Sequence, residues 1–169
     1  MATRDVETLR VVIGLGANLG DRAATLREAV RSIAAVEGVR VGARSRIYET
    51  DAVGGVEQPP FLNAAISAEC TLVPRALLEA LLAIEASLGR DRSADTVRWG
   101  PRRIDLDVLW IDGRVVDEAG LSVPHPRVTE RAFAMVPLLE VAPGAVDPYT
   151  KQRYVAPADD GVRVTSLDW

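Results

Sequence analysis

Two runs of alternating residues, 39–48 and 61–71, follow each other along the chain with no helical pattern between them. Every second residue of each run is apolar or small, which is the pattern of a strand that buries one face. Strands joined without a helix usually pair antiparallel, because a parallel connection normally needs a helical crossover. The two runs therefore predict an antiparallel sheet.

The flanking patterns complete a strand–helix–strand–strand–helix–strand order. Residues 10–15 are apolar on both faces, as expected of a central strand, and 21–38 repeats apolar residues at helical spacing. A second helix is predicted at 74–88, followed by a strand at 104–111. We therefore predict an α+β fold, a ferredoxin-like βαββαβ antiparallel sheet with both helices on one face and the other face free for ligands.

The composition is that of one globular domain. No repeat or low-complexity linker divides the chain, so we predict a single domain over residues 1–169, with a C-terminal helix around 129–141 and an irregular tail. Its irregular ends are residues 1–9 and 144–169. The formal net charge of −4 argues against a nucleic-acid surface, and no apolar run approaches the ~20 residues that span a bilayer. With one cysteine, Cys70, we expect a cytoplasmic protein without disulfides, nucleic acid, membrane or an obligate protein partner.

The glycines between the first strand and the first helix invite a dinucleotide-binding interpretation. Gly14, Gly16 and Gly20 join the two elements, but Leu19 stands where the fingerprint requires glycine. No acidic residue ends a second parallel strand at the expected distance, and an antiparallel pair follows instead. We interpret these glycines as tight turns of the chain.

The segment 98–109 carries the strongest chemical signal. Asp105 and Asp107 lie two residues apart on the predicted last strand, so their carboxylates share a face about 6–7 Å apart. Adjacent carboxylates repel unless a proton or a cation intervenes, and Mg²⁺ typically takes one or two protein carboxylates plus phosphate oxygens. A solvated strand face with local Asp–Arg pairs is the alternative. The arginines of the long 89–103 connection, which can meet phosphates, favour the metal site.

Residues 98–109 (RWGPRRIDLDVL) resemble the signature of the hydroxymethyldihydropterin pyrophosphokinases. Further motifs follow in the family's order, namely GLGANLG at 14–20, YET at 48–50, QPPFLNAA at 58–65, VPHPR at 123–127 and RAF at 131–133. The resemblance implies an enzyme of folate biosynthesis that uses Mg²⁺. It would transfer a diphosphate from ATP to the hydroxymethyl group of 6-hydroxymethyl-7,8-dihydropterin and release AMP.

The resemblance also implies roles for individual residues. Two magnesium ions would lie between ATP and the pair Asp105 and Asp107, while two catalytic arginines, Arg90 and Arg102, would close over the triphosphate. The implied ATP contacts are Arg98, Trp99, Arg102, Val108, Ser122, His125 and Arg131. The implied pterin contacts are Thr50, Val53, Phe61, Asn63 and Phe133, in which the two phenylalanines sandwich the ring and the amide reads its edge.

The sequence departs from the family pattern beside the pterin contacts. Asp51 follows Thr50 where the family often has proline, which predicts a more flexible loop, and Phe61 stands where tyrosine is common. Two alternatives remain from the residues themselves. One is a ferredoxin-like module that binds nucleic acid or a small ligand without catalysis, although the basic-aromatic RNA-binding signature is missing. The other is a different nucleotide-dependent transferase, which would release ADP rather than AMP.

Overall fold

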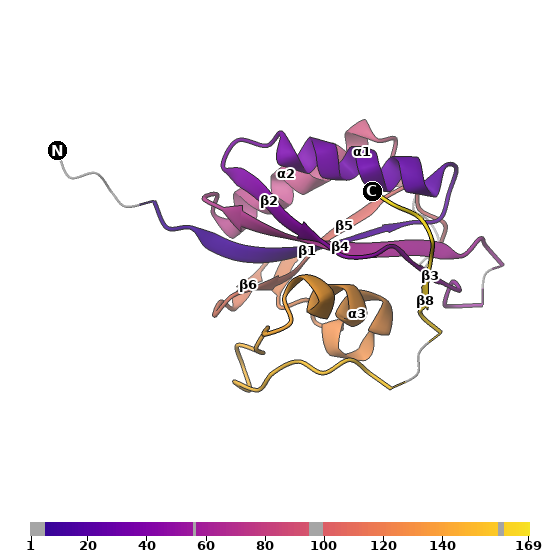
Figure 1. Cartoon of the computed structure of the whole chain (residues 1–169). Helices are drawn as coiled ribbons and strands as arrows, with labels where there is room; N and C mark the ends of the chain where they lie inside the picture. Colours follow the sequence, from indigo (N-terminus) through magenta and orange to yellow (C-terminus); the bar gives the residue numbers. More distant parts are fainter. Residues whose placement is uncertain (1–5, 56, 95–99, 159–160) are drawn as a thin grey trace.

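The computed structural model describes residues 6–55, 57–94, 100–158 and 161–169. Over these residues the chain forms a mixed α/β fold, an antiparallel sheet with three α-helices. Figure 1 shows the sheet between helices α1 and α2 on one side and helix α3 on the other. The elements are β1 (Leu9–Ala17), α1 (Arg22–Ala34), β2 (Val39–Arg44), β3 (Tyr48–Thr50), β4 (Phe61–Cys70), α2 (Pro74–Ser87), η1 (Arg92–Ala94), β5 (Asp105–Ile111), β6 (Val116–Glu118), β7 (Leu121–Val123), η2 (Val128–Glu130), α3 (Ala132–Val141) and β8 (Arg163–Val164).

Strand β1 is central, as its two apolar faces predict. It pairs antiparallel with β4 on one side and with β5 on the other. The sheet runs β5-β1-β4-β3-β8, and β2 also pairs with β4. The antiparallel sheet predicted from the sequence is therefore confirmed, and the parallel pairing of a dinucleotide-binding unit is not what β1 forms.

Helices α1 and α2 begin where the sequence predicts and α2 also ends there, whereas α1 ends at Ala34, before the predicted limit at residue 38. The Asp21 carboxylate caps α1 by accepting from the Ala24 N–H at 3.0 Å. Pro74 opens α2, where its missing N–H costs no hydrogen bond, and Gly89 follows that helix with φ +89°, a conformation that favours glycine. Leu77 and Leu81 of α2 pack with Leu26 of α1 into the core against the sheet.

The run 39–48, predicted as one strand, forms two. The register between β2 and β4 shifts between Val41 and Arg44. The Ser45 N–H then donates to the Ala65 carbonyl at 2.9 Å, but the Ala65 N–H donates to the Ser45 hydroxyl, also at 2.9 Å, instead of to the Ser45 carbonyl. Side-chain competition of this kind breaks the ladder. Strand β3 then begins at Tyr48 and continues to Thr50, two residues beyond the end of the predicted run.

The sequence suggested that the second face of the sheet would be free for ligands. In the structure, part of this face is covered. Met135 and Leu138 of α3 pack on Val12, Ala65 and Trp110 and form a second core. The expectation failed because the face changes character along each strand. Its apolar half attracts the apolar helix, while Gly16, Asn63, Asp105 and Asp107 occupy the half that stays uncovered.

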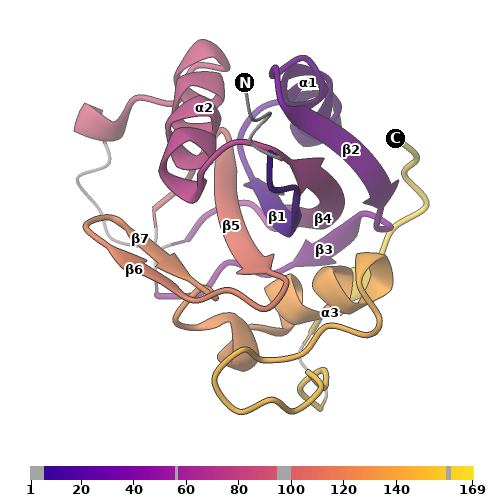
Figure 2. The same ribbon diagram turned by 90° about the vertical axis from the view of Figure 1, so that its left-hand side faces the viewer.

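Two further segments contain short strands that the sequence did not predict. Strands β6 and β7 form a hairpin beside β5, seen at the side of the sheet in Figure 2. Within the predicted irregular tail, β8 pairs with β3. Each of these strands has only two or three residues, too few to show an alternation in the sequence.

Candidate active site

A cleft of about 980 Å³ opens on the uncovered half of the second face. Eleven of the predicted site residues line it: Thr50, Val53, Phe61, Asn63, Arg90, Arg102, Asp105, Asp107, His125, Arg131 and Phe133. Val108 is buried in the core on the opposite face, and Ser122 is exposed on β7, so neither side chain lies in the cleft wall. Arg98 and Trp99 lie outside the described residues.

Strand register places the metal and pterin candidates in one row. Gly16 of β1 pairs with Asn63 of β4 on one side and with Asp105 of β5 on the other. Directly paired residues share a face of the sheet. A Cβ added to Gly16 would lie 3.1 Å from the Asn63 Oδ1. Because Gly16 has no side chain, the sheet surface between the Asn63 amide and the Asp105 carboxylate is open to the cleft.

The two aspartates have unequal surroundings. Asp105 accepts from Arg90 at 2.7 Å and from Arg102 at 3.0 Å. Burial, with the nearby carboxylates of Asp105 and Glu85, raises the pKa of Asp107 to about 7. Among the described residues no three metal-binding side chains converge. Two carboxylates are nevertheless the usual protein share of a magnesium site whose other ligands are phosphate and water.

Sequence reasoning missed Glu85, which is only 1% exposed. Its carboxylate accepts from the Leu106 N–H at 2.7 Å, from Arg90 at 3.1 Å and from Arg92 at 2.6 Å. Arg90, 4% exposed at its side chain, is thereby held between α2 and Asp105. The available signal was a glutamate next to Ile84 on the apolar stripe of α2, since a buried carboxylate requires partners.

His125 faces the cleft as a neutral hydrogen-bond donor and Arg131 faces it as a cation. Burial, together with the charge of Arg131, lowers the pKa of His125, so the neutral imidazole prevails at neutral pH. Its Nδ1 accepts from the Arg127 N–H at 3.2 Å, which assigns the remaining proton to Nε2 and makes that atom a donor. Burial also lowers the pKa of Arg131, yet a guanidinium stays charged. It lies 5.6 Å from the Phe133 ring centre.

The pterin candidates meet at the end of β3 and β4. Asn63 is 7% exposed and donates from Nδ2 to the Thr50 hydroxyl at 2.7 Å. That contact uses one amide proton and orients the group, leaving the second proton for another acceptor. Phe61 pairs with Thr50 across the two strands, and with Phe133 it supplies aromatic surface to the same cleft.

A second residue missed from the sequence, Asn18, links the loop before β5 to the loop before β4. It is 1% exposed. Its Oδ1 accepts from the Arg102 N–H at 2.7 Å, and its own N–H donates to the Arg102 carbonyl at 3.1 Å. Its Nδ2 donates to the Gln58 Oε1 at 2.9 Å and to the Pro59 carbonyl at 3.1 Å. The residue lies within the GLGANLG run, but its partners are 40 or more residues away, which no local pattern reveals.

The C-terminal tail also reaches the cleft. Pro157, Ala158 and Gly161 line it beside the predicted residues, although the sequence showed no functional signal beyond residue 143. Small apolar and backbone surfaces of this kind carry no motif. Separately, no helix among the described residues combines the length and the hydropathy that crossing a bilayer requires.

Comparison with known proteins identifies what the chain resembles. Residues 12–143 match the family model described as 7,8-dihydro-6-hydroxymethylpterin-pyrophosphokinase (HPPK). The chain is 50% identical over 137 residues to the 2-amino-4-hydroxy-6-hydroxymethyldihydropteridine pyrophosphokinase of Methylorubrum extorquens, covering 81% of this chain and 85% of that one. The enzyme of the same name from Bacillus subtilis is 46% identical over 129 residues, covering 76% of this chain and 75% of the other.

The fold agrees with a solved structure. The Plasmodium falciparum HPPK-DHPS crystal structure with pterin and p-hydroxybenzoate superposes with a TM-score of 0.67 at 14% identity, over 90% of this chain and 43% of that larger one. At such identity the likeness concerns the fold alone. The sequence matches carry the assignment: the chain belongs to the 7,8-dihydro-6-hydroxymethylpterin-pyrophosphokinase family, and its role is that of an ATP-using pyrophosphokinase of folate biosynthesis.

Proposed function

We propose that the cleft transfers the diphosphate of ATP to the hydroxymethyl group of 6-hydroxymethyl-7,8-dihydropterin with two magnesium ions held by Asp105 and Asp107. The observation that carries this proposal is their position. Asp105 accepts from Arg90 and Arg102 and lies across Gly16 from Asn63, and Asp107 lines the same cleft. Bound magnesium would neutralise charge on the phosphate oxygens during transfer.

The chain's own part is alignment. Arg102 reaches Asp105 at 3.0 Å and lines the cleft, so it is placed to turn to a phosphate once a cation takes over that carboxylate. Arg90 is held by Glu85, so we propose that it orients Asp105 and presents a fixed charge to the triphosphate. His125 would donate its Nε2–H to a phosphate oxygen rather than move a proton, because its pKa is lowered and it is neutral.

The pterin would lie between Phe61 and Phe133, with its hydroxymethyl oxygen directed to the carboxylates across Gly16. Thr50 orients the Asn63 amide for the pterin edge. The oxygen attacks the β-phosphorus of ATP, the bond from that phosphorus to the α-phosphate oxygen breaks, and AMP leaves. The hydroxyl proton passes to solvent or to a phosphate oxygen in this scheme.

The test is incubation of the protein with ATP, Mg²⁺ and the pterin alcohol, followed by separation of the nucleotides. AMP should accumulate in step with the pterin diphosphate and should depend on Mg²⁺. Release of ADP would instead support the alternative of a different nucleotide-dependent transferase. Absence of any nucleotide consumption, with retained ligand binding, would support a module without catalysis.

The metal assignment has its own variants. Asp105→Ala and Asp107→Ala should each lower turnover by at least ~10²-fold, the scale for losing one preorganised electrostatic group. Asp117→Ala, on the exposed hairpin strand β6, is the matched control and should retain normal turnover. Near-normal turnover in both cleft variants would remove the two aspartates from the metal site.

We also propose that the central unit is ferredoxin-like. The elements β1, α1, β2, β4, α2 and β5 follow the βαββαβ order, and the sheet order β5-β1-β4 with β2 beyond β4 supports it. The buried free thiol of Cys70 supports a reducing, cytoplasmic location.

A further inference from the structure

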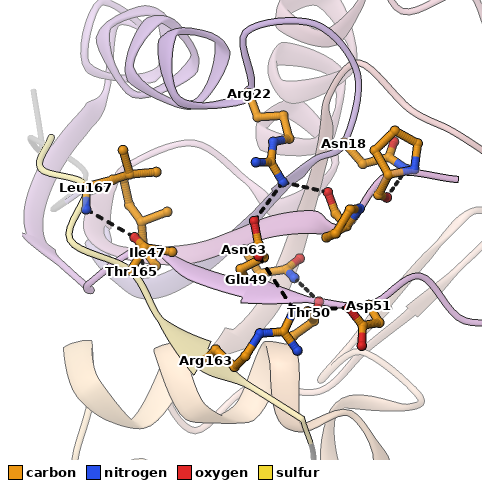
Figure 3. Close-up of polar contacts among 12 residues, drawn as sticks. Asn18, Arg22, Ile47, Glu49, Thr50, Asp51, Asn63, Arg163, Thr165 and Leu167 are labelled. Atoms are coloured by element: carbon orange, nitrogen blue, oxygen red, sulfur yellow. Dashed lines mark hydrogen bonds and ion pairs between the residues drawn. The ribbon is translucent and has the colours of Figure 1, made fainter.

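The C-terminal segment runs along the outer edge of β3, as Figure 3 shows. Within β8, Arg163 pairs with Glu49 and Val164 with Tyr48. The following Thr165 N–H then donates to the Ile47 carbonyl at 3.0 Å. At its end the Trp169 indole N–H donates to the Ser45 carbonyl at 2.6 Å. The segment therefore covers an edge that would otherwise present unpaired backbone groups.

Arg163 connects this segment to the residues beside the proposed pterin contacts. Its Nη2 lies 3.0 Å from the Asp51 Oδ1 and 3.5 Å from the Glu49 Oε1. The other Glu49 oxygen takes Arg22 at 3.1 Å, and Arg22 also donates to the Pro60 carbonyl at 2.8 Å. One network of charges, drawn in Figure 3, thus holds both ends of the loop between β3 and β4.

The place of Asp51 explains why this loop needs an outside anchor. Proline fixes its own backbone angle φ, and the aspartate that stands at this position does not. Its side chain is 79% exposed, so burial contributes little to holding it, and its ion pair with Arg163 restrains it instead. Thr50 precedes Asp51, and Val53 follows two residues later, both in the cleft wall. Holding Asp51 therefore bears directly on two proposed pterin contacts.

We propose that in this chain the C-terminal segment positions the pterin-binding loop, with Arg163 as the positioning residue and Glu49 and Asp51 as its partners. The proposal rests on the pterin site proposed above. The segment lies beyond residue 143, where the match to the family model ends, and its Pro157, Ala158 and Gly161 reach the same cleft. It thus supplies a wall of the site as well as an anchor for the loop.

The test is Arg163→Ala compared with Arg153→Ala. Arg153 is an exposed arginine of the same tail whose backbone bridges to Val146, away from the loop. Exposed ion pairs are individually weak, so Arg163→Ala should raise the KM for the pterin by about fivefold. The KM for ATP and kcat should stay within about twofold of the original, and Arg153→Ala should change none of them. Arg163→Lys, which keeps the charge, should recover part of the loss.

A double-variant cycle isolates the contact. Asp51→Asn alone should raise the pterin KM, and adding it to Arg163→Ala should have less effect than in the original chain, because the two residues act through one contact. Additive effects would mean that Arg163 does not act through Asp51. Equal loss of kcat and of ATP affinity in Arg163→Ala would indicate a general structural role and overturn the proposal.

Amide hydrogen exchange separates this proposal from the function on which it rests. In Arg163→Ala, exchange should accelerate at residues 48–53 and remain unchanged in β5. Unchanged exchange at 48–53 with an unchanged pterin KM would overturn the anchor. If the unaltered protein neither bound the pterin nor formed AMP, the proposed function would fail, whereas the exchange experiment would still decide whether Arg163 orders the loop.

Discussion

Among single residues, Gly16 is notable because its lack of a side chain leaves space between the proposed metal site and the proposed pterin site. Gly16 lies across from Asp105 on one strand and from Asn63 on another, and it lines the cleft. Its backbone does not occupy the positive-φ region that would explain a glycine. We therefore propose that this glycine allows a ligand to approach the strand closely, a role that glycine commonly has in sheets.

Gly16→Ala tests this directly. The new Cβ would lie 3.1 Å from the Asn63 Oδ1, so the amide must shift, and we expect the pterin KM to rise about tenfold. The melting temperature should change little, because alanine is compatible with this strand conformation. Gly144→Ala is the control, since a Cβ there meets no atom within 4 Å. An unchanged pterin KM in Gly16→Ala would place the substrate elsewhere.

Among the elements, helix α3 is linked to the sheet by the carboxylate of Glu140 in addition to its apolar packing. Glu140 accepts from the Arg46 N–H at 3.0 Å, from the Arg46 Nε at 3.2 Å and from the Tyr48 hydroxyl. Burial alone would raise the pKa of Glu140, but these hydrogen bonds and the Arg46 charge outweigh it and leave the pKa lowered. The carboxylate therefore links the helix that covers half of the sheet to the start of β3.

A lowered carboxyl pKa fixes the sign of the pH dependence. Glu140 contributes stability above its ordinary pKa of 4.5, and this contribution is lost as pH falls through the lower folded value. At pH 7, Glu140→Gln should reduce the free energy of unfolding by about 1–2 kcal/mol in urea titrations. The gap from the original chain should narrow below about pH 4.5. Glu28→Gln, from an exposed pair with Arg31, should cost at most about 0.5 kcal/mol. A gap that widened in acid would refute this account of Glu140.

Helices and long strands could be predicted because their signals are local and repeated. The stripe of α2 and the alternation of β4 each span three or more periods, and both elements begin where expected. The break at Ser45 could not be predicted, because it depends on a hydrogen bond between its hydroxyl and the Ala65 N–H of another strand. The strands β6, β7 and β8 have only two or three residues each, too few to produce a recognisable alternation in the sequence.

The proposed site divides along the same line. Nine of the eleven predicted cleft residues, Asp105 and Asn63 among them, lie within the sequence motifs, because the chemistry of each requires a particular residue type. Arg90 and Val53 lie outside the motifs and were predicted from the family resemblance alone. Glu85, Asn18 and Arg163 escaped because they act through partners distant in sequence. The role of such a supporting residue can be assigned only when its distant partners are known, even where, as for Asn18, the residue itself lies in a motif.

At the scale of the molecule, the cleft is assembled from segments spread from β1 to the C-terminal segment, so ligand binding should stabilise the whole fold. A non-hydrolysable ATP analogue with Mg²⁺, each at about 100 times its Kd, should add about 2.7 kcal/mol. For a chain of this size that should raise the melting temperature by about 5–10 °C. The analogue without Mg²⁺ should give a smaller rise.

The matched variants assign that shift. The double variant Asp105→Asn, Asp107→Asn should lose the Mg²⁺-dependent part of the rise, because neither amide can offer an anionic oxygen. Asp117→Asn should keep it. A full Mg²⁺-dependent shift in the double variant, read by differential scanning calorimetry, would mean that the ion binds without these side chains.

The buried side-chain amide of Asn18 forms hydrogen bonds with two loops at the same time. It accepts from the Arg102 N–H in the loop before Asp105 and donates to Gln58 and Pro59 in the loop before Phe61. In the proposed complex, we expect a nucleotide that restricts the motion of the first loop to restrict the second as well, through Asn18, and we expect a pterin to have the converse effect. The conformational entropy that the loops lose when one substrate binds is then not lost again when the other binds. Reciprocal linkage then requires each substrate to tighten the binding of its companion by the same factor.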